Sequence, residues 1–258
     1  MRVLFVGDVV GPAAVAYLAD RLPVLRADLA LDVVIANAEN CGPTGIGMAV
    51  DLVERLVAAG VDVVTAGNHA FDGPEVAGVL AVPRVLRPLN LSPGVLGRGS
   101  ITIDVGGEAL TVLVLADREA LALAPSVAAF GRRPWDAWCA AERLGTVIVD
   151  YHAQSDMEKE AFAHAVDGAA AAVIGTHTHV PTLPLHLLTC GTALVTDVGM
   201  TGPAGGIEGF DAARYVEIVR GTPPEAAPPV RVAGGPIVLG AVVLDIEAGR
   251  TTAIARVT

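Results

Sequence analysis

Apolar and polar positions alternate along the chain in the rhythm of strands followed by helices. Short runs rich in valine and isoleucine each precede a longer segment with apolar residues at a helical period, a pattern typical of α/β proteins. The apolar runs predict strands over Arg2–Gly7, Val33–Asn37, Val61–Gly67, Thr146–Tyr151, Ala171–Gly175 and Thr192–Val198.

Helices are predicted between these strands. Pro12 to about Ala30 has a helical pattern that Pro23 kinks or divides, because proline lacks the amide hydrogen that an internal position needs. Further helices are predicted near Met48–Ala59, after Pro74, and from Ser155 to about Val166. Ser155 and Glu158 have the spacing of a capping box.

Two stretches depart from the alternation. Residues 84–116 contain the closely spaced runs RVLRPLN, SITIDV and ALTVLVLA, which predict an antiparallel group of strands. Residues 117–144 predict helical pieces broken by Pro125 and Pro134. The C-terminal residues predict a β-hairpin that turns across Glu247, Ala248 and Gly249, and the proline-rich segment 223–229 reads as a surface loop.

These elements predict one α/β domain over residues 1–258, with two sheets packed face to face and helices outside them. The alternative is a single doubly wound sheet with an inserted hairpin layer. Apolar residues make up 53% of the chain and its mean hydropathy is +0.57, so much of it is expected to be buried.

Composition limits the classes of partner. No apolar run reaches the roughly 18 residues that span a bilayer, and the segment MRVLFVGDVVG is too short and too acidic for a secretory signal. A net charge of −11 and only 4% aromatic residues argue against a long nucleic-acid partner. Cys41, Cys139 and Cys190 form no disulfide framework, which favours a reducing cytoplasm. The high hydropathy hints at a homo-oligomer.

Residues that bind metals in proteins follow the apolar runs, at or just beyond the end of each strand. They are Asp8, Glu39, Asn40, Asn68, His69, His152, His177 and His179. Because binding groups gather beyond the carboxyl ends of strands in such sheets, we expect these side chains to meet in one pocket. In GTHTH (175–179), two imidazoles stand two residues apart, so in an extended segment both would face the same side.

Each signal has an ordinary explanation when taken alone. Asn68 could cap a helix, Asp8 could do the same, and His152 could be a hydrogen-bonded core residue. Glu39 is harder to explain in this way, because an acid at the end of a buried strand needs a partner. The coincidence of these residues at separate strand ends favours a shared metal site.

The motifs GD (7–8), NAEN (37–40), GNH (67–69), DYHA (150–153), GTHTHVPT (175–182) and DVGMTGP (197–203) occur in this order. Together they resemble the YmdB-like branch of the calcineurin-like metallophosphoesterases. The resemblance implies a four-layer α/β/β/α sandwich with a dinuclear metal centre. It also implies two ligand sets that share Glu39 as a bridge. One set is Asp8, Glu39, Asn40 and His179, and the other is Glu39, Asn68, His152 and His177. Val10 stands where the wider superfamily has a histidine, and in the YmdB-like branch Asn40 takes that role.

The implied ligands carry two negative charges against at least four positive charges from two divalent ions. The residual charge of about +2 suits a phosphate ester and favours ionisation of a bound water. Nitrogen and oxygen ligands without thiolate favour iron or manganese, with zinc as an alternative. We expect attack on phosphorus by a hydroxide that bridges the metals, with His69 donating a proton to the leaving group and Asp72 orienting His69.

The resemblance further implies hydrolysis of small phosphodiesters, namely 2′,3′-cyclic nucleotides to 3′-nucleotides. One alternative is a regulatory or scaffolding protein that keeps the pocket, and another is a metal hydrolase of a different bond, such as an amidase. Residues 117–135 match the family poorly and could line the substrate pocket. Cys41 lies beside two implied ligands, where a redox or soft-metal role competes with simple packing.

Overall fold

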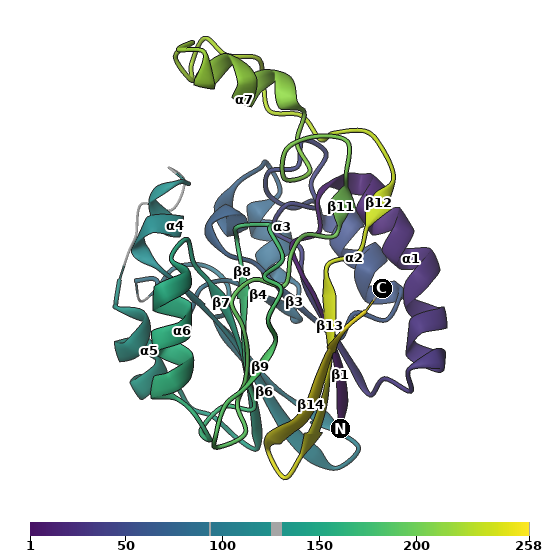
Figure 1. Ribbon diagram of the computed structural model, residues 1–258, viewed down its shortest axis with the longest axis vertical. Coiled ribbons are helices and arrows are strands. Elements are labelled where there is room, and N and C mark those ends of the chain that lie inside the picture. The colour runs from purple at the N-terminus through teal and green to yellow at the C-terminus, as the bar shows by residue number, and fades with distance from the viewer. Residues whose placement is uncertain (93, 125–130, 258) are drawn as a thin grey trace.

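The computed structural model describes residues 1–92, 94–124 and 131–257 (Figure 1). Within these ranges, two six-stranded sheets form the centre of the molecule. The first sheet has the order β14 (Arg250–Arg256), β13 (Ala241–Glu247), β1 (Arg2–Val6), β2 (Val33–Asn37), β3 (Val63–Thr65) and β4 (Val85–Leu86). The second has the order β5 (Ser100–Val105), β6 (Glu108–Ala116), β7 (Thr146–His152), β8 (Ala172–Thr176), β10 (Ala193–Val195) and β9 (His186–Leu187).

Parallel strands make up the middle of both sheets. Strands β1 to β4 run parallel in the first sheet, and β6, β7, β8 and β10 run parallel in the second. The flanking strands β13, β14, β5 and β9 pair antiparallel with their neighbours. Because the parallel strands are in register, the ends of β1, β2 and β3 are brought together, as are those of β7 and β8.

Helices cover the outer face of each sheet, which gives four layers (Figure 1). The first sheet is covered by α1 (Gly11–Asp28), α2 (Val50–Ala58) and α3 (Val76–Ala81), and the second by α5 (Pro134–Ala140) and α6 (Asp156–Ala165). Alternate side chains of the strands divide between the layers. Val3 and Phe5 pack between the sheets, whereas Leu4 and Val6 face the helices. The predicted two-sheet sandwich is therefore confirmed over the single doubly wound sheet.

Three predicted elements differ from the structure. Helix α1 is not divided at Pro23, since Pro23 lies on the exposed face, where water can solvate the carbonyl that loses its donor. Strand β4 does not join the predicted antiparallel group but pairs parallel with β3, so only β5 and β6 form a hairpin. Pro134 begins α5 instead of breaking a helix, and Pro125 lies outside the described ranges.

An arm between β11 (Gly202–Pro203) and β12 (Ile237–Val238) was not predicted from the sequence. It carries α7 (Ala212–Val219), which projects from the top of the sandwich in Figure 1 and has no buried residue. The remaining short elements are α4 (Arg118–Ala122) and a 3₁₀ turn over Asn68–Phe71. Among the helices of the described ranges, none is both long and apolar enough to cross a membrane.

Candidate metal centre

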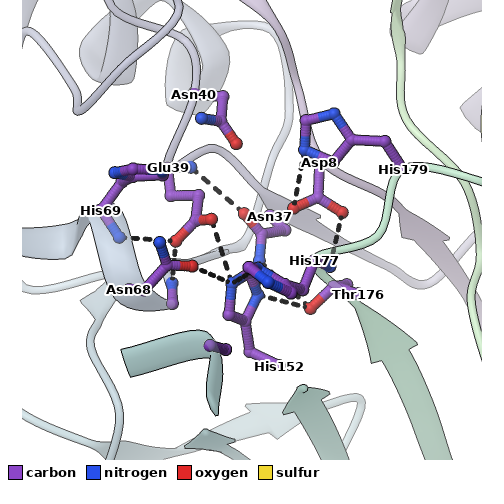
Figure 2. A network of polar contacts seen from close by, with 12 residues as sticks. Asp8, Asn37, Glu39, Asn40, Asn68, His69, His152, Thr176, His177 and His179 are labelled. Carbon is purple, nitrogen blue, oxygen red and sulfur yellow. Dashed lines mark hydrogen bonds and ion pairs between the residues drawn. The ribbon is translucent and has the colours of Figure 1, made fainter. Parts of the chain in front are cut away.

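The implied metal ligands lie together on the rim where the parallel strands of both sheets end (Figure 2). Asp8, Glu39 and Asn68 follow strands of the first sheet, whereas His152 ends β7 and His177 follows β8 of the second. Most of these side chains have almost no exposure to solvent: Asp8 0%, Glu39 1%, Asn40 1%, Asn68 0%, His152 0% and His179 8%. The rim is therefore a buried polar cluster drawn from both sheets.

His152 is at the centre of one half of the cluster. Its Nε2 lies 2.7 Å from Asn68 Oδ1, 3.1 Å from Glu39 Oε1 and 3.0 Å from His177 Nδ1. One ring nitrogen can direct a single lone pair or hydrogen at one partner, so three polar neighbours at this distance exceed its bonding capacity. Glu39, His152 and His177 each offer a ligand atom, and these atoms all lie within 4.8 Å of one another, as a shared cation requires.

Asp8 and His179 form the other half, which lies beside the first in Figure 2. Asp8 Oδ1 is 3.7 Å from His179 Nε2, and Asp8 Oδ2 accepts a hydrogen bond of 3.2 Å from the His177 amide. Asn40 lines the same cavity, and its Nδ2 donates to the Gly45 carbonyl at 2.7 Å. This bond turns the Asn40 oxygen away from Gly45.

Hydrogen bonds behind the cluster fix which atom each imidazole presents. His152 Nδ1 is 2.8 Å from Thr176 Oγ1, and that hydroxyl donates to Asp150 Oδ1 at 2.6 Å. The Thr176 oxygen therefore accepts from His152 Nδ1, which leaves Nε2 facing the cluster. His179 Nδ1 donates to the Glu208 carbonyl at 2.8 Å, which leaves Nε2 facing Asp8. Such outer hydrogen bonds are typical of metal-binding histidines.

The backbone of the THTH segment is not extended. His177 and His179 have φ angles of 96° and 63°, in the left-handed region, so the expected alternation of an extended segment is wrong here. Asp197 holds the residue between them, because its Oδ2 accepts from the Thr178 amide at 3.1 Å and from the Thr178 hydroxyl at 2.8 Å. Both imidazoles still reach the cluster, through a bend instead of a strand.

Burial and charge shift the pKa values of the cluster in opposite directions. Burial raises the pKa of Asp8 to about 6. Burial also acts to raise the pKa of Glu39, but the charge and hydrogen bond of His152 outweigh it and lower that pKa. For His152, burial opposes the charged form, and Glu39 overcomes this to raise the pKa to about 9. Burial, together with the charge of His152, lowers the pKa of His177 to about 2, so this ring is a neutral potential ligand.

Three buried polar atoms of the cluster have no hydrogen-bond partner among the described residues: Asp8 Oδ1, Asn40 Oδ1 and Asn68 Nδ2. A buried oxygen without a hydrogen-bond partner costs free energy. Asp8 Oδ1, 3.7 Å from His179 Nε2, and Asn40 Oδ1, on a residue that lines the cavity, are therefore potential ligands for a cation. The donor set of carboxylate, carboxamide and imidazole fits iron, manganese or zinc. The residues present therefore fit a metal centre.

His69 lies in the cavity beside the cluster without joining it. Its Nδ1 is 2.6 Å from Asp72 Oδ2, which leaves Nε2 available to the cavity. Burial acts to lower the pKa of His69, but the hydrogen bond to Asp72 and the charge of Glu39 outweigh burial and raise it. Asp72 thus lies within hydrogen-bond distance of the His69 ring, and its orienting role stays a prediction.

A glycine allows the close approach of the two sheets at this rim. A β-carbon at Gly67 would lie 2.0 Å from the His152 ring, so no larger residue fits before Asn68. The Gly67 and His69 amides donate to Glu39 Oε2 at 2.6 and 3.1 Å and hold that carboxylate in place. The sequence analysis gave no role to Thr176 or Asp150, although the motifs GTHTH and DYHA contain them. It also gave none to Gln154, which adjoins DYHA and whose Oε1 lies 3.1 Å from His177 Nε2.

Cys41 is fully buried in the core between the first sheet and its helices, and burial raises its thiol pKa to about 12. A thiol that stays protonated is unreactive and a poor metal ligand. Burial of Cys41 among apolar side chains of the core favours the packing interpretation. From the poorly matching segment 117–135, Leu123 lines the cavity, as expected for part of that segment.

Comparison with known proteins gives consistent results. A curated relative from Bacillus subtilis (strain 168), named 2′,3′-cyclic-nucleotide 2′-phosphodiesterase, is 36% identical over 250 residues, which cover 96% of this chain and 92% of the relative. A crystal structure of a hypothetical protein from Thermus thermophilus is 38% identical, with a TM-score of 0.89 over 100% of this chain and 98% of the other. A crystal structure of a novel phosphatase from Mycoplasma pneumoniae is 28% identical, with a TM-score of 0.90 over 100% and 92%.

The model of one protein family, described as YmdB-like protein, matches residues 4–257. This match includes every residue of the buried polar cluster, from Asp8 to His179, and extends through the arm to β14. The chain therefore belongs to the YmdB-like protein family.

Proposed function

We propose that this protein is a metal-dependent phosphodiesterase that hydrolyses 2′,3′-cyclic nucleotides to 3′-nucleotides with a dinuclear centre. The observation that carries the proposal is the pair of buried oxygens without a hydrogen-bond partner, Asp8 Oδ1 and Asn40 Oδ1, in the same polar cluster as the potential ligands Glu39, His152 and His177. The Bacillus subtilis relative supports the substrate class. The cavity has a volume of about 240 Å³, which is compatible with a small molecule.

The proposed ligands divide between the two halves of the cluster. Asp8, Asn40 and His179 would hold one cation, Asn68, His152 and His177 would hold the other, and Glu39 would contact both. Cations bound there would favour ionisation of a water molecule and offset the negative charge of the phosphate. Iron or manganese suits the donor set, with zinc as the alternative.

His69 is the proposed proton donor. With Nδ1 bonded to Asp72, Nε2 of its imidazolium points a hydrogen into the cavity, where the 2′ oxygen of the substrate would leave phosphorus. The Asp72 carboxylate stabilises the imidazolium and fixes the ring, so Asp72 acts as a positioning residue. Water adds to phosphorus, the bond to the 2′ oxygen breaks, and the 3′-phosphate remains on the ribose.

The test combines metal analysis of purified protein with a panel of 2′,3′-cyclic nucleotides in the presence of manganese or iron. We expect turnover to 3′-nucleotides and loss of activity on chelation. Release of 2′-nucleotides, or activity that survives full chelation, would contradict the proposal.

The role of His69 is tested with His69→Ala. We expect kcat to fall by about 10²–10⁴, the usual contribution of a general acid, while the bound metal per chain stays unchanged. His164→Ala is the matched control, because His164 is exposed on α6 and does not line the cavity. Unchanged kcat in His69→Ala would remove His69 from the mechanism.

A further inference from the structure

The cavity at the metal centre has two chemically different parts. Its polar part is lined by residues of the cluster and by His69, whereas its apolar part is lined by Ile46, Leu123, Phe210 and Tyr215. Phe210 and Tyr215 belong to the arm that carries α7, so an element outside the sandwich contributes to the cavity. The proposed metal chemistry gives no role to this apolar part.

Phe210 lines the cavity and is held in place by its neighbours. Its ring stacks on the ring of His179, with centroids 6.0 Å apart and an interplanar angle of 19°. On another side it meets Gly45, where an added β-carbon would lie 2.7 Å from the Phe210 ring. Gly45 also has a φ of +81°, so both its backbone and its neighbour require glycine. Phe210 is 7% exposed and thus held between the loop of Gly45 and a proposed metal ligand.

A tight turn fixes the start of the arm relative to the metal centre. Ile207 and Phe210 exchange backbone hydrogen bonds of 2.8 and 2.9 Å across Glu208 and Gly209. The Glu208 carbonyl accepts from His179 Nδ1 at 2.8 Å, so the turn is bonded directly to the centre. This hydrogen bond therefore fixes the start of the arm relative to His179, a proposed metal ligand.

Tyr215 lines the cavity next to Phe210. The two rings have centroids 6.3 Å apart and an interplanar angle of 57°. Tyr215 is in the first turn of α7, which Asp211 caps by accepting from the Ala213 amide at 2.8 Å. The Tyr215 side chain is half-buried, so part of its ring remains free to contact a ligand in the cavity.

We propose that Tyr215, backed by Phe210, is the contact for the nucleobase of the substrate and a determinant of specificity for nucleoside over simple cyclic phosphates. The inference rests on the proposed function. A substrate whose phosphate lies at the polar part must extend its remaining groups along the cavity, and the arm supplies an aromatic surface there. A planar base has a π-face that stacks on such a surface whatever its hydrogen-bonding groups, so the contact selects for a base and not for one particular base.

The experiment compares two substrates in the manganese-loaded enzyme. One is 2′,3′-cyclic AMP, and the other is methyl riboside 2′,3′-cyclic phosphate, which has the same reacting ester and no base. For Tyr215→Ala we expect KM for the cyclic nucleotide to rise about tenfold, with little change in kcat and no change with the methyl riboside. Tyr215→Phe keeps the ring and should retain the wild-type KM for both.

Val219→Ala is the matched control on the same helix, because Val219 is 88% exposed and does not line the cavity. It should leave both substrates unaffected. An equal effect of Tyr215→Ala on both substrates, or none on either, overturns the nucleobase contact while leaving the proposed function intact. Failure of the wild-type enzyme to hydrolyse either ester would instead overturn the proposed function, and the base contact with it.

Discussion

At the scale of single residues, the geometry of the proposed metal centre depends on side chains behind the ligands. Thr176 is fully buried and lies between His152 Nδ1 and Asp150, to which its hydroxyl donates. Asp150 also accepts from Thr65 Oγ1 at 2.5 Å and from Asn37 Nδ2 at 3.2 Å. This network directs Nε2 of His152 toward the cluster, so removing the network should weaken metal binding.

Thr176→Val tests this chain of hydrogen bonds. Valine matches the shape of threonine but leaves His152 Nδ1 without its acceptor, and we expect the affinity for manganese to fall by about 10- to 100-fold. Thr111→Val is the control, since Thr111 is a buried threonine of the same sheet whose hydroxyl bonds to Thr102 and the Leu144 carbonyl. Equal metal affinity in the two variants, measured by calorimetry, would show that Thr176 does not position His152.

At the scale of elements, a buried ion pair joins α6 to Asp197, which follows β10 and is hydrogen-bonded to the loop that carries two proposed ligands. Lys159 and Asp197 are both 0% exposed, and Lys159 Nζ lies 3.3 Å from Asp197 Oδ2. The same carboxylate oxygen accepts both hydrogen bonds from Thr178, between the left-handed His177 and His179. The strained backbone at these histidines is thus held by Asp197, whose charge Lys159 balances.

Lys159→Met should lower the free energy of unfolding by roughly 3–5 kcal/mol, because it leaves the Asp197 carboxylate buried without its counter-charge. Addition of Asp197→Asn removes that charge, so the double variant should recover part of the loss. Urea unfolding of the wild type, both single variants and the double variant measures the coupling. Strict additivity of the two substitutions would argue that the pair contributes nothing as a unit.

The elements that the sequence predicted well are those with a strong local signal. The strands of the parallel core are continuous apolar runs, and the Ser155 cap appears in the structure as a hydrogen bond from the Glu158 amide. The pairing of β4 could not be predicted, because a run of two buried residues fits either sheet and only tertiary packing decides. Helix α7 was missed although Asp211 caps it, since the prolines and glycines around it gave the stronger local signal of a loop.

The same holds for the site: local sequence patterns predicted some of its residues, whereas others are positioned only by contacts between distant parts of the chain. The sequence predicted that the polar residues at strand ends lie together, because the ends of parallel strands converge. Phe210 and Tyr215 reach the cavity from the arm, and the sequence of the arm gave no hydrophobic periodicity from which its path could be predicted. The bend at His177 depends on Asp197, which lies 19 residues beyond Thr178 along the chain, and so no local pattern could predict it.

At the scale of the whole molecule, the proposed centre joins the two sheets. Asp8, Glu39 and Asn68 come from the first sheet and His152 and His177 from the second, so a bound cation would connect the layers at their shared rim. A ligand that binds the folded chain and not the unfolded chain stabilises the fold by mass action. Metal at a hundred times its dissociation constant should therefore raise Tm by about 5–10 °C above that of the chelated protein.

Glu39→Gln separates the metal effect from the fold itself. Glutamine keeps an oxygen that can accept from the Gly67 and His69 amides, but it removes the charge shared by the two proposed sites. The chelated variant should thus melt near the chelated wild type, and the rise in Tm on adding manganese should be lost. Glu54→Gln, at an exposed position on α2, should keep the full rise. A full rise in Glu39→Gln would mean that the cations do not share this carboxylate, and the division of ligands around it would have to be redrawn.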